Sequence, residues 1–130
     1  MSKILIVEDN PVINQMYRIK LEANGYNVTV ATTGKEALEL TKKLTPDLIL
    51  LDIMMPEMNG DECLEILRRD KKFAETPVIV LTNMNNDAIV EKFETLGVDS
   101  FLLKSELTPK QVLEHVDKCL KGAKKEKKDD

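Results

Sequence analysis

Residues 47–52 are Asp47-Leu48-Ile49-Leu50-Leu51-Asp52, four consecutive aliphatic residues with an acid at each end. A run of this length fits a β-strand, and its consecutive apolar residues predict a strand that is buried on both faces. Such strands are typical of parallel sheets that carry helices on both sides. Asp52 then stands at the end of a buried strand, where a charge is costly without partners.

Four further apolar runs of strand length occur along the chain, at residues 4–7, 28–31, 78–81 and 101–103. Segments with a helical pattern of apolar residues separate them. Strands that alternate with helices indicate βαβ units with right-handed crossovers. The sequence therefore predicts an α/β fold, a doubly wound parallel sheet of five strands with five helices.

Capping residues indicate where the helices begin and end. Asn10 followed by Pro11 is typical of a helix start, because proline at the first helical position has no N–H to leave unsatisfied. Thr33 and Glu36 have the spacing of a capping box. Further boundaries are expected at Gly25, before Pro46, from about Gly60 to Asp70, at Gly97 and at Thr108-Pro109.

Polar residues stand at the ends of four predicted strands: Glu8 and Asp9 after the first, Asp52 after the third, Thr82 on the fourth and Lys104 after the fifth. Ligands of doubly wound sheets bind beyond the carboxyl ends of the strands. Any one of these residues alone would be an ordinary solvated strand end. Because all five occur at the edge where this fold binds ligands, we expect them to form one site.

The chemistry of these side chains indicates a metal-assisted phosphoryl acceptor. Three neighbouring carboxylates repel one another and need cations, and oxygen ligands without His or Cys select Mg²⁺ or Mn²⁺. One divalent ion and protonated Lys104 balance the three charges. Asp52 is already ionised at neutral pH, so it can attack phosphorus without a general base and form an aspartyl phosphate. Thr82, Lys104 and the metal would stabilise the transferring oxygens.

Five segments of the chain resemble response-regulator receiver domains of two-component signal transduction, over residues 3 to about 121. They are Ile4-Leu5-Ile6-Val7-Glu8-Asp9, Asp47-Leu48-Ile49-Leu50-Leu51-Asp52-Ile53-Met54-Met55-Pro56, Met58-Asn59-Gly60, Val80-Leu81-Thr82 and Phe101-Leu102-Leu103-Lys104. The resemblance implies a flavodoxin-like sheet with strand order 2-1-3-4-5. It also implies a receiver domain over residues 1–122.

The resemblance implies a role for each matching residue. Asp52 is the expected phosphoacceptor. Thr82 and Lys104 contact the phosphoryl group, and Thr82 and Phe101 act as the switch. The expected donor is a sensor histidine kinase, and the signal leaves for a downstream protein target or output domain through the face of the fourth helix, fifth strand and fifth helix. Slow autodephosphorylation is expected. The expected Mg²⁺ ligands are Glu8, Asp9, Asp52 and the backbone carbonyl of Met54.

Three residues depart from the pattern of that family. Ser105 stands where the family mostly has proline, often after a cis bond, so the sequence leaves the Lys104–Ser105 bond open between cis and trans. Asn83 replaces a small residue, and a side chain of that size is expected to narrow access to Asp52. Phe101 lacks the hydroxyl group of the tyrosine that could stand there.

Composition excludes several classes of protein. The net charge is −4, whereas a nucleic-acid-binding surface needs a basic face. No apolar stretch approaches the roughly 20 residues of a membrane span, and no signal peptide is evident. Cys63 and Cys119 lack a metal or disulfide spacing, so a cytoplasmic location is expected. Residues 123–130 are mostly charged and predict a flexible tail or the start of a linker.

The sequence bears on three alternative functions. A flavin-binding module would need a glycine- and hydroxyl-rich loop after the first strand, where Glu8 and Asp9 stand instead. A haloacid-dehalogenase-like phosphatase would need Asp-x-Asp, whereas Met54 follows Asp52 by two residues. The alternative that stays open is a phosphorylation-independent interaction module with the receiver fold. Members of that kind generally lose one of the acidic residues or the lysine.

Overall fold

The structure is a computed structural model that describes residues 2–55, 57–84 and 86–129, with side chains described up to Lys121. Strands and helices alternate from one end of the chain to the other, as the sequence predicted. The elements are β1 Lys3–Val7, α1 Pro11–Glu22, β2 Asn27–Ala31, α2 Gly34–Leu44, β3 Leu48–Leu51, α3 Gly60–Arg69, β4 Val78–Thr82, α4 Asp87–Leu96, β5 Ser100–Leu103, the 3₁₀ turn η1 Lys104–Glu106 and α5 Pro109–Asp129.

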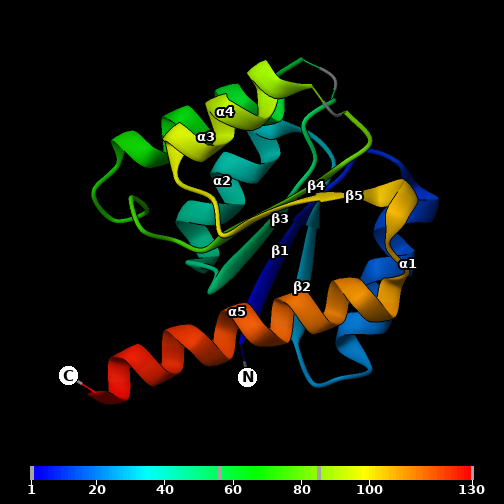
Figure 1. Cartoon of the computed structure of the whole chain (residues 1–130), viewed down its shortest axis with the longest axis vertical. Helices are drawn as coiled ribbons and strands as arrows, with labels where there is room; N and C mark the ends of the chain where they lie inside the picture. The colour runs from blue at the N-terminus through cyan, green and yellow to red at the C-terminus, as the bar shows by residue number, and fades with distance from the viewer. Residues whose placement is uncertain (1, 56, 85, 130) are drawn as a thin grey trace.

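The five strands form one parallel sheet in the order β2-β1-β3-β4-β5. Helices α2, α3 and α4 lie on one face of the sheet, and α1 and α5 lie on the other (Figure 1). The doubly wound fold and the strand order that the resemblance implied are both confirmed. In this order β1 and β3 are neighbours, and their carboxyl ends lie side by side, with Val7 opposite Leu51.

Each face of the sheet has its own apolar core, and alternate residues of one strand enter different cores. On β1, Leu5 and Val7 pack with residues of α2, α3 and α4, whereas Ile4 and Ile6 pack with residues of α1 and α5. A strand that is covered on both faces needs apolar residues at consecutive positions. The burial of both faces explains why the apolar runs of the sequence are continuous.

Side chains cap the helices close to the predicted positions. The Asn10 side-chain oxygen accepts hydrogen bonds from the N–H groups of residues 12 and 13, at 2.9 and 3.1 Å. The Thr33 hydroxyl accepts from the Glu36 N–H at 3.1 Å, and the Glu36 carboxylate accepts from the Thr32 N–H at 2.7 Å. A standard capping box would pair Glu36 with Thr33 itself, so the return bond is one residue earlier than predicted. Gly97 ends α4 with a φ of 81°.

Helix α5 continues to Asp129, past the domain boundary expected at residue 122. The segment expected to be a flexible tail belongs to this helix up to that residue, and its flexibility stays a prediction. Lys, Glu and Ala, which make up most of it, have high helix propensity. The role of residues 123–129 as a linker start stays a prediction, and residue 130 lies outside the described residues. Among the described residues, no helix is both long and apolar enough to cross a membrane.

Candidate functional site

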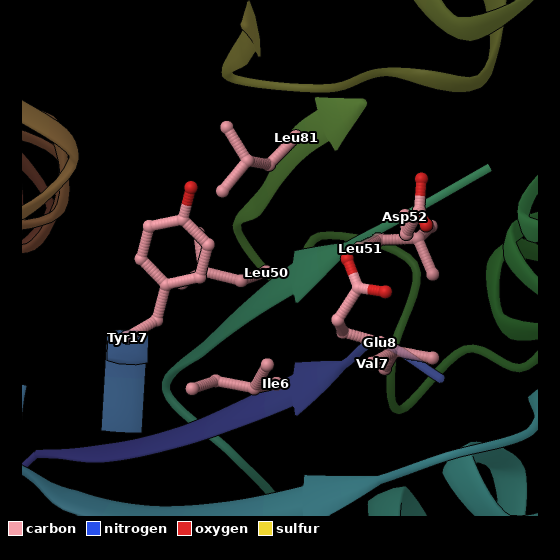
Figure 2. Close-up of a pocket in the computed structure, with 8 residues that line it drawn as sticks. All are labelled: Ile6, Val7, Glu8, Tyr17, Leu50, Leu51, Asp52 and Leu81. Carbon is pink, nitrogen blue, oxygen red and sulfur yellow. The ribbon is translucent and has the colours of Figure 1, made fainter. Parts of the chain in front are cut away.

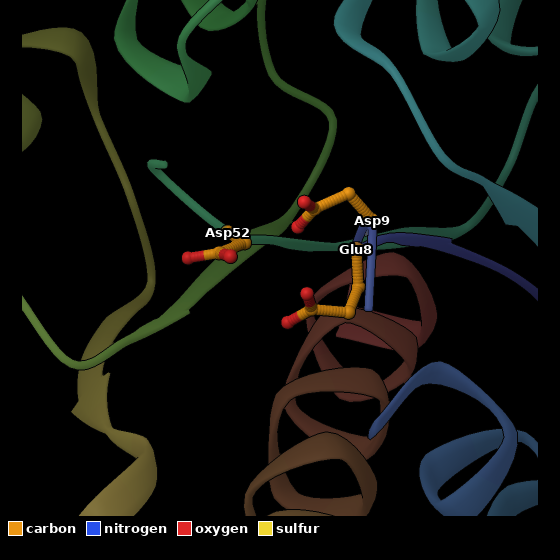
Figure 3. A group of neighbouring side chains, drawn as sticks. All are labelled: Glu8, Asp9 and Asp52. Carbon is orange, nitrogen blue, oxygen red and sulfur yellow. The ribbon is translucent and has the colours of Figure 1, made fainter. Parts of the chain in front are cut away.

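Three acidic side chains meet at the carboxyl ends of β1 and β3 (Figure 3). Glu8, Asp9 and Asp52 each offer one carboxylate oxygen, and these three oxygens all lie within 4.8 Å of one another. Glu8 and Asp52 are buried, and Asp9 is exposed to solvent. The parallel register of β1 and β3 brings these acids together although they are far apart in the sequence.

Backbone hydrogen bonds continue the sheet into this cluster and fix its two buried acids. The Asp52 N–H donates to the Val7 carbonyl at 3.0 Å, and the Glu8 N–H donates to the Ala31 carbonyl at 3.0 Å. One Asp52 carboxylate oxygen accepts from the Ile53 N–H at 2.8 Å. One Glu8 carboxylate oxygen accepts from the Asn10 N–H at 3.0 Å. Both buried acids thus have a backbone donor in addition to any cation.

Lys104 supplies a positive charge to the two buried acids. Its Nζ donates to Glu8 and lies 3.2 Å from Oδ2 of Asp52. Burial acts to lower the pKa of Lys104, but the hydrogen bond to Glu8 and the attraction of Asp52 outweigh it, so the pKa is raised above its usual value. Lys104 is therefore protonated at neutral pH.

Thr82 ends β4, the neighbour of β3, and is 1% exposed. Its hydroxyl accepts a hydrogen bond from the Met84 N–H at 3.2 Å, which makes a tight turn after the strand. Met54 lies two residues after Asp52, and its side chain is exposed. The phosphate contact of Thr82 and the metal contact of Met54 stay predictions.

Phe101 lies on β5 and is half-buried. Its ring meets the ring of Phe93 on α4 edge to face, with 5.9 Å between centroids and an angle of 62° between planes. Phe93 is fully buried in the core that α2, α3 and α4 share with the sheet. The residue predicted to be the switch aromatic is therefore in direct contact with α4.

Gly60 has a role that the sequence analysis did not find. A Cβ at this position would lie 2.3 Å from the carbonyl oxygen of Asp52 and 2.9 Å from Cα of Ile53. The Gly60 N–H also donates to the Ile53 carbonyl at 2.7 Å. Only glycine permits this approach, so Gly60 helps to hold the backbone of the candidate acceptor. The Met58-Asn59-Gly60 motif belongs to the resemblance with receiver domains, but the sequence did not indicate which residue Gly60 contacts.

Tyr17 is a second residue beside the acidic cluster that the sequence did not single out. It reaches from α1 toward β1, β3 and β4 and lines a small cavity with Glu8 and Asp52 (Figure 2). The cavity has a volume of about 10 Å³, roughly the size that one water molecule requires. Burial raises the pKa of the Tyr17 hydroxyl, which keeps it neutral beside the acidic cluster.

The peptide bond between Lys104 and Ser105 is trans, since the described residues contain no cis peptide bond. The Ser105 N–H donates to the side-chain oxygen of Asn83 at 3.1 Å. Asn83 is exposed, and this contact directs its side chain toward the segment that follows β5. Two of the three departures from the family pattern, Asn83 and Ser105, thus contact each other.

Comparison with known proteins identifies the class. A family model described as the response regulator receiver domain matches residues 4–117. The polar-differentiation response regulator DivK of Brucella ovis is 34% identical over 84% of this chain and 89% of that protein. The transcriptional regulatory protein YdfI of Bacillus subtilis is 36% identical over 94% of this chain and 56% of that protein.

Solved structures agree. The chemotaxis protein CheY4 of Vibrio cholerae has a TM-score of 0.85 at 30% identity, over 92% of this chain and 98% of that one. A CheY-like receiver domain protein from Methanospirillum hungatei has a TM-score of 0.90 at 28% identity, over 97% of this chain and 98% of that one.

The chain belongs to the response-regulator receiver domains of two-component systems. It spans about half the length of several curated relatives that it matches, including YdfI at 56% and the regulator RpaA of Synechocystis at 43%. Receiver domains take phosphoryl groups from histidine kinases and can be joined to output domains.

Proposed function

We propose that this receiver domain accepts a phosphoryl group on Asp52 from a sensor histidine kinase, with Mg²⁺ or Mn²⁺ held by Glu8, Asp9, Asp52 and the Met54 carbonyl. The observation that carries the proposal is the cluster of three carboxylate oxygens within 4.8 Å of one another, with Lys104 Nζ at 3.2 Å from Asp52. The alternative, an interaction module that needs no phosphorylation, gives no reason to keep three repelling acids together.

The donor set fits a hard divalent ion. All the side-chain ligands are carboxylates, and no His or Cys belongs to the cluster among the described residues. Lys104 alone leaves a net negative charge beside Asp52, which would repel a phosphoryl donor. A bound divalent ion would supply the missing positive charge and polarise the phosphoryl oxygens.

In the proposed transfer, an Asp52 carboxylate oxygen forms the new bond to phosphorus while the phosphorus–nitrogen bond of the donor histidine breaks. Oδ1 is held by the Ile53 N–H, and Oδ2 faces Lys104. Lys104 would exchange its contact with Asp52 for one with a phosphoryl oxygen, and the Thr82 hydroxyl would donate to another. Slow attack of water on the aspartyl phosphate would return the domain to its resting form.

The proposed output passes through Thr82 and Phe101. A Thr82 hydroxyl drawn toward a phosphoryl group would leave the Met84 N–H, and Phe101 would turn into the space that opens. Because Phe101 contacts Phe93, a turn of the ring would reach α4. The face of α4, β5 and α5 would then present the signal to a downstream protein target or a joined output domain. The two free cysteines fit the cytoplasmic location that we propose.

Labelling with acetyl phosphate and Mg²⁺ tests the acceptor. We expect mass spectrometry to find one added phosphoryl group in the wild type and none in Asp52→Asn. Asp47→Asn is a matched control, since Asp47 precedes the same strand at its opposite end and its carboxylate accepts from the Lys3 N–H. Labelling that survives in Asp52→Asn would reject Asp52 as acceptor. A wild type that takes no label would favour the phosphorylation-independent module.

A further inference from the structure

The segment that follows β5 is held by a side chain from the end of the neighbouring strand. The last paired residues of β4 and β5 are Thr82 and Leu103, and the chain then turns into η1 at Lys104. Backbone pairing between the two strands stops there. One residue further on, the Asn83 side-chain oxygen accepts the Ser105 N–H at 3.1 Å. A side chain thus extends the contact between β4 and β5 beyond the end of the sheet.

Because of this contact, the residues on both sides of Lys104 are hydrogen-bonded to the end of β4. Leu103 is held in the sheet opposite Thr82, and Ser105 is held by Asn83. Asn83 itself stands in the turn that the Met84 N–H closes on the Thr82 hydroxyl. The backbone of Lys104 is therefore held in place on both sides, and this placement determines where its ammonium group can reach.

We propose that Asn83 is a positioning residue for phosphoryl transfer, because its hydrogen bond to Ser105 holds Lys104 where its ammonium group reaches Asp52. The inference rests on the proposed function and deepens it by adding a residue that acts through Lys104. Asn83, Lys104 and Ser105 also line one hollow of about 190 Å³ that opens beside α1. A shift of the segment from Lys104 to Leu107 would alter both the reach of the lysine and the shape of this hollow.

Loss of the hydrogen bond between Asn83 and Ser105 should change the structure only near these two residues, because both are exposed to solvent. Asn83 and Ser105 are exposed, so water can replace the hydrogen bond when Asn83 is truncated. The fold would then lose little stability, while the segment after β5 would gain freedom. A positioning role predicts slower labelling when Asn83 is truncated, whereas a covering role predicts faster labelling. A side chain that shields Asp52 would, on truncation, speed both the arrival of donors and the attack of water.

The test compares the wild type with Asn83→Ala and with Asn86→Ala. Asn86 belongs to the same connection between β4 and α4, but its oxygen accepts from the Ile89 N–H at 2.9 Å within its own helix end. We expect Asn83→Ala to take label from acetyl phosphate about three- to tenfold more slowly at saturating Mg²⁺, a range typical of losing one hydrogen bond. The dissociation constant for Mg²⁺ should stay the same, and Asn86→Ala should label like the wild type.

Amide hydrogen exchange measured by NMR gives a second, structural readout. The Ser105 N–H should exchange faster in Asn83→Ala and regain its protection in Asn83→Asp, which retains an acceptor oxygen. Faster labelling together with faster loss of the phosphoryl group in Asn83→Ala would overturn the proposal in favour of a covering role. An unchanged labelling rate with a freed Ser105 N–H would also overturn it.

The two proposals fail in different ways. If the wild type takes no label at all, the proposed function fails, and the positioning role of Asn83 fails with it. If the wild type takes label on Asp52 and Asn83→Ala does so at the same rate, only the positioning role fails.

Discussion

The ammonium nitrogen of Lys104 lies 3.2 Å from Oδ2 of Asp52 and also donates to Glu8. One cation at the end of β5 thus bridges two buried acids at the ends of β1 and β3. The side chains of Lys104, Glu8 and Asp52 are 13%, 5% and 8% exposed, so water screens their charges poorly. Removal of the cation would leave two buried carboxylates facing each other.

We therefore expect Lys104→Met to lower the free energy of unfolding by up to about 3 kcal/mol in the absence of divalent ions, because both buried acids lose the ammonium group that neutralises them. Urea denaturation in the presence of a chelator measures the loss. Mg²⁺ should restore more stability to this variant than it adds to the wild type. Lys92→Met is the control, because Lys92 pairs with Asp61 and Glu65 at the surface. This substitution should lower the free energy of unfolding clearly less than Lys104→Met. Equal losses in the two variants would contradict the bridging role of Lys104.

Asp9 is the exposed member of the acidic cluster, and it makes no ion pair among the described residues. We expect Asp9→Asn to weaken Mg²⁺ binding at least about tenfold, because the ion loses one of three charged ligands. Without metal the variant should be as stable as the wild type or slightly more so, since repulsion within the cluster falls. Calorimetric Mg²⁺ titration and thermal melts measure the two effects.

The matched control for Asp9 is Glu39→Gln, which removes a charge from an exposed position on α2. It should leave the Mg²⁺ titration unchanged. Should Asp9→Asn titrate like the wild type, Asp9 is not a metal ligand.

The sequence predicted the fold because burial on both faces of a sheet leaves a local signature. The run from Leu48 to Leu51 is apolar at every position, and each residue enters a core. The acidic cluster was also predictable, because parallel strands present their carboxyl ends at one edge. Both inferences need only the order of residues along the chain and the general rules of α/β sheets.

Details that depend on the path of a loop were not predictable. The close approach of Gly60 to the carbonyl of Asp52 requires the path of the segment between β3 and α3. The contact between Asn83 and Ser105 depends on the paths of the two segments that leave β4 and β5, which must stay within hydrogen-bond distance. The sequence showed that both residues depart from the family, but nothing in their spacing indicated that they touch.

The ring contact between Phe93 and Phe101 gives a prediction about packing. A double-mutant cycle of Phe93→Leu and Phe101→Leu should give a coupling of about 0.5–1.5 kcal/mol in the free energy of unfolding, since leucine keeps most of the apolar volume and removes the edge-to-face contact. Phe73→Leu is the control, because the buried Phe73 forms no ring pair with Phe101 among the described residues. Its cycle with Phe101→Leu should give a coupling near zero.

Cys63 gives a prediction about pH. Burial raises the pKa of its thiol from 9.0 to about 11, so folding favours the neutral thiol. The stability that this group contributes is present below pH 9 and is lost as the pH rises through about 11. Between these values the free energy of unfolding should fall more steeply in the wild type than in Cys63→Ala. The native Cys63 thiol should also resist alkylation by iodoacetamide at pH 8.5. If the free energy of unfolding falls equally steeply with pH in the two proteins, the pKa of Cys63 is not raised.

Gly60→Ala tests whether close packing behind Asp52 matters for the site. The added methyl group would meet the Asp52 carbonyl at 2.3 Å, so the backbone after β3 or the start of α3 must move. We expect a loss of about 1–3 kcal/mol in the free energy of unfolding, typical of overpacking, together with slower labelling by acetyl phosphate. Gly25→Ala is the control. Its methyl group would meet no atom of the described residues within 4 Å, but its φ of +89° strains any other residue, so it should lose stability as well.

The two glycine variants separate an effect on stability from an effect on the site. Gly25 stands between α1 and β2, away from the carboxyl ends of the strands, so Gly25→Ala should label at the wild-type rate while it remains folded. Gly60→Ala should label more slowly even under conditions where both variants are fully folded, because the carbonyl that its methyl group displaces belongs to Asp52 itself. Equal labelling rates in the two folded variants would mean that the Asp52 carboxylate keeps its position when the backbone behind it shifts.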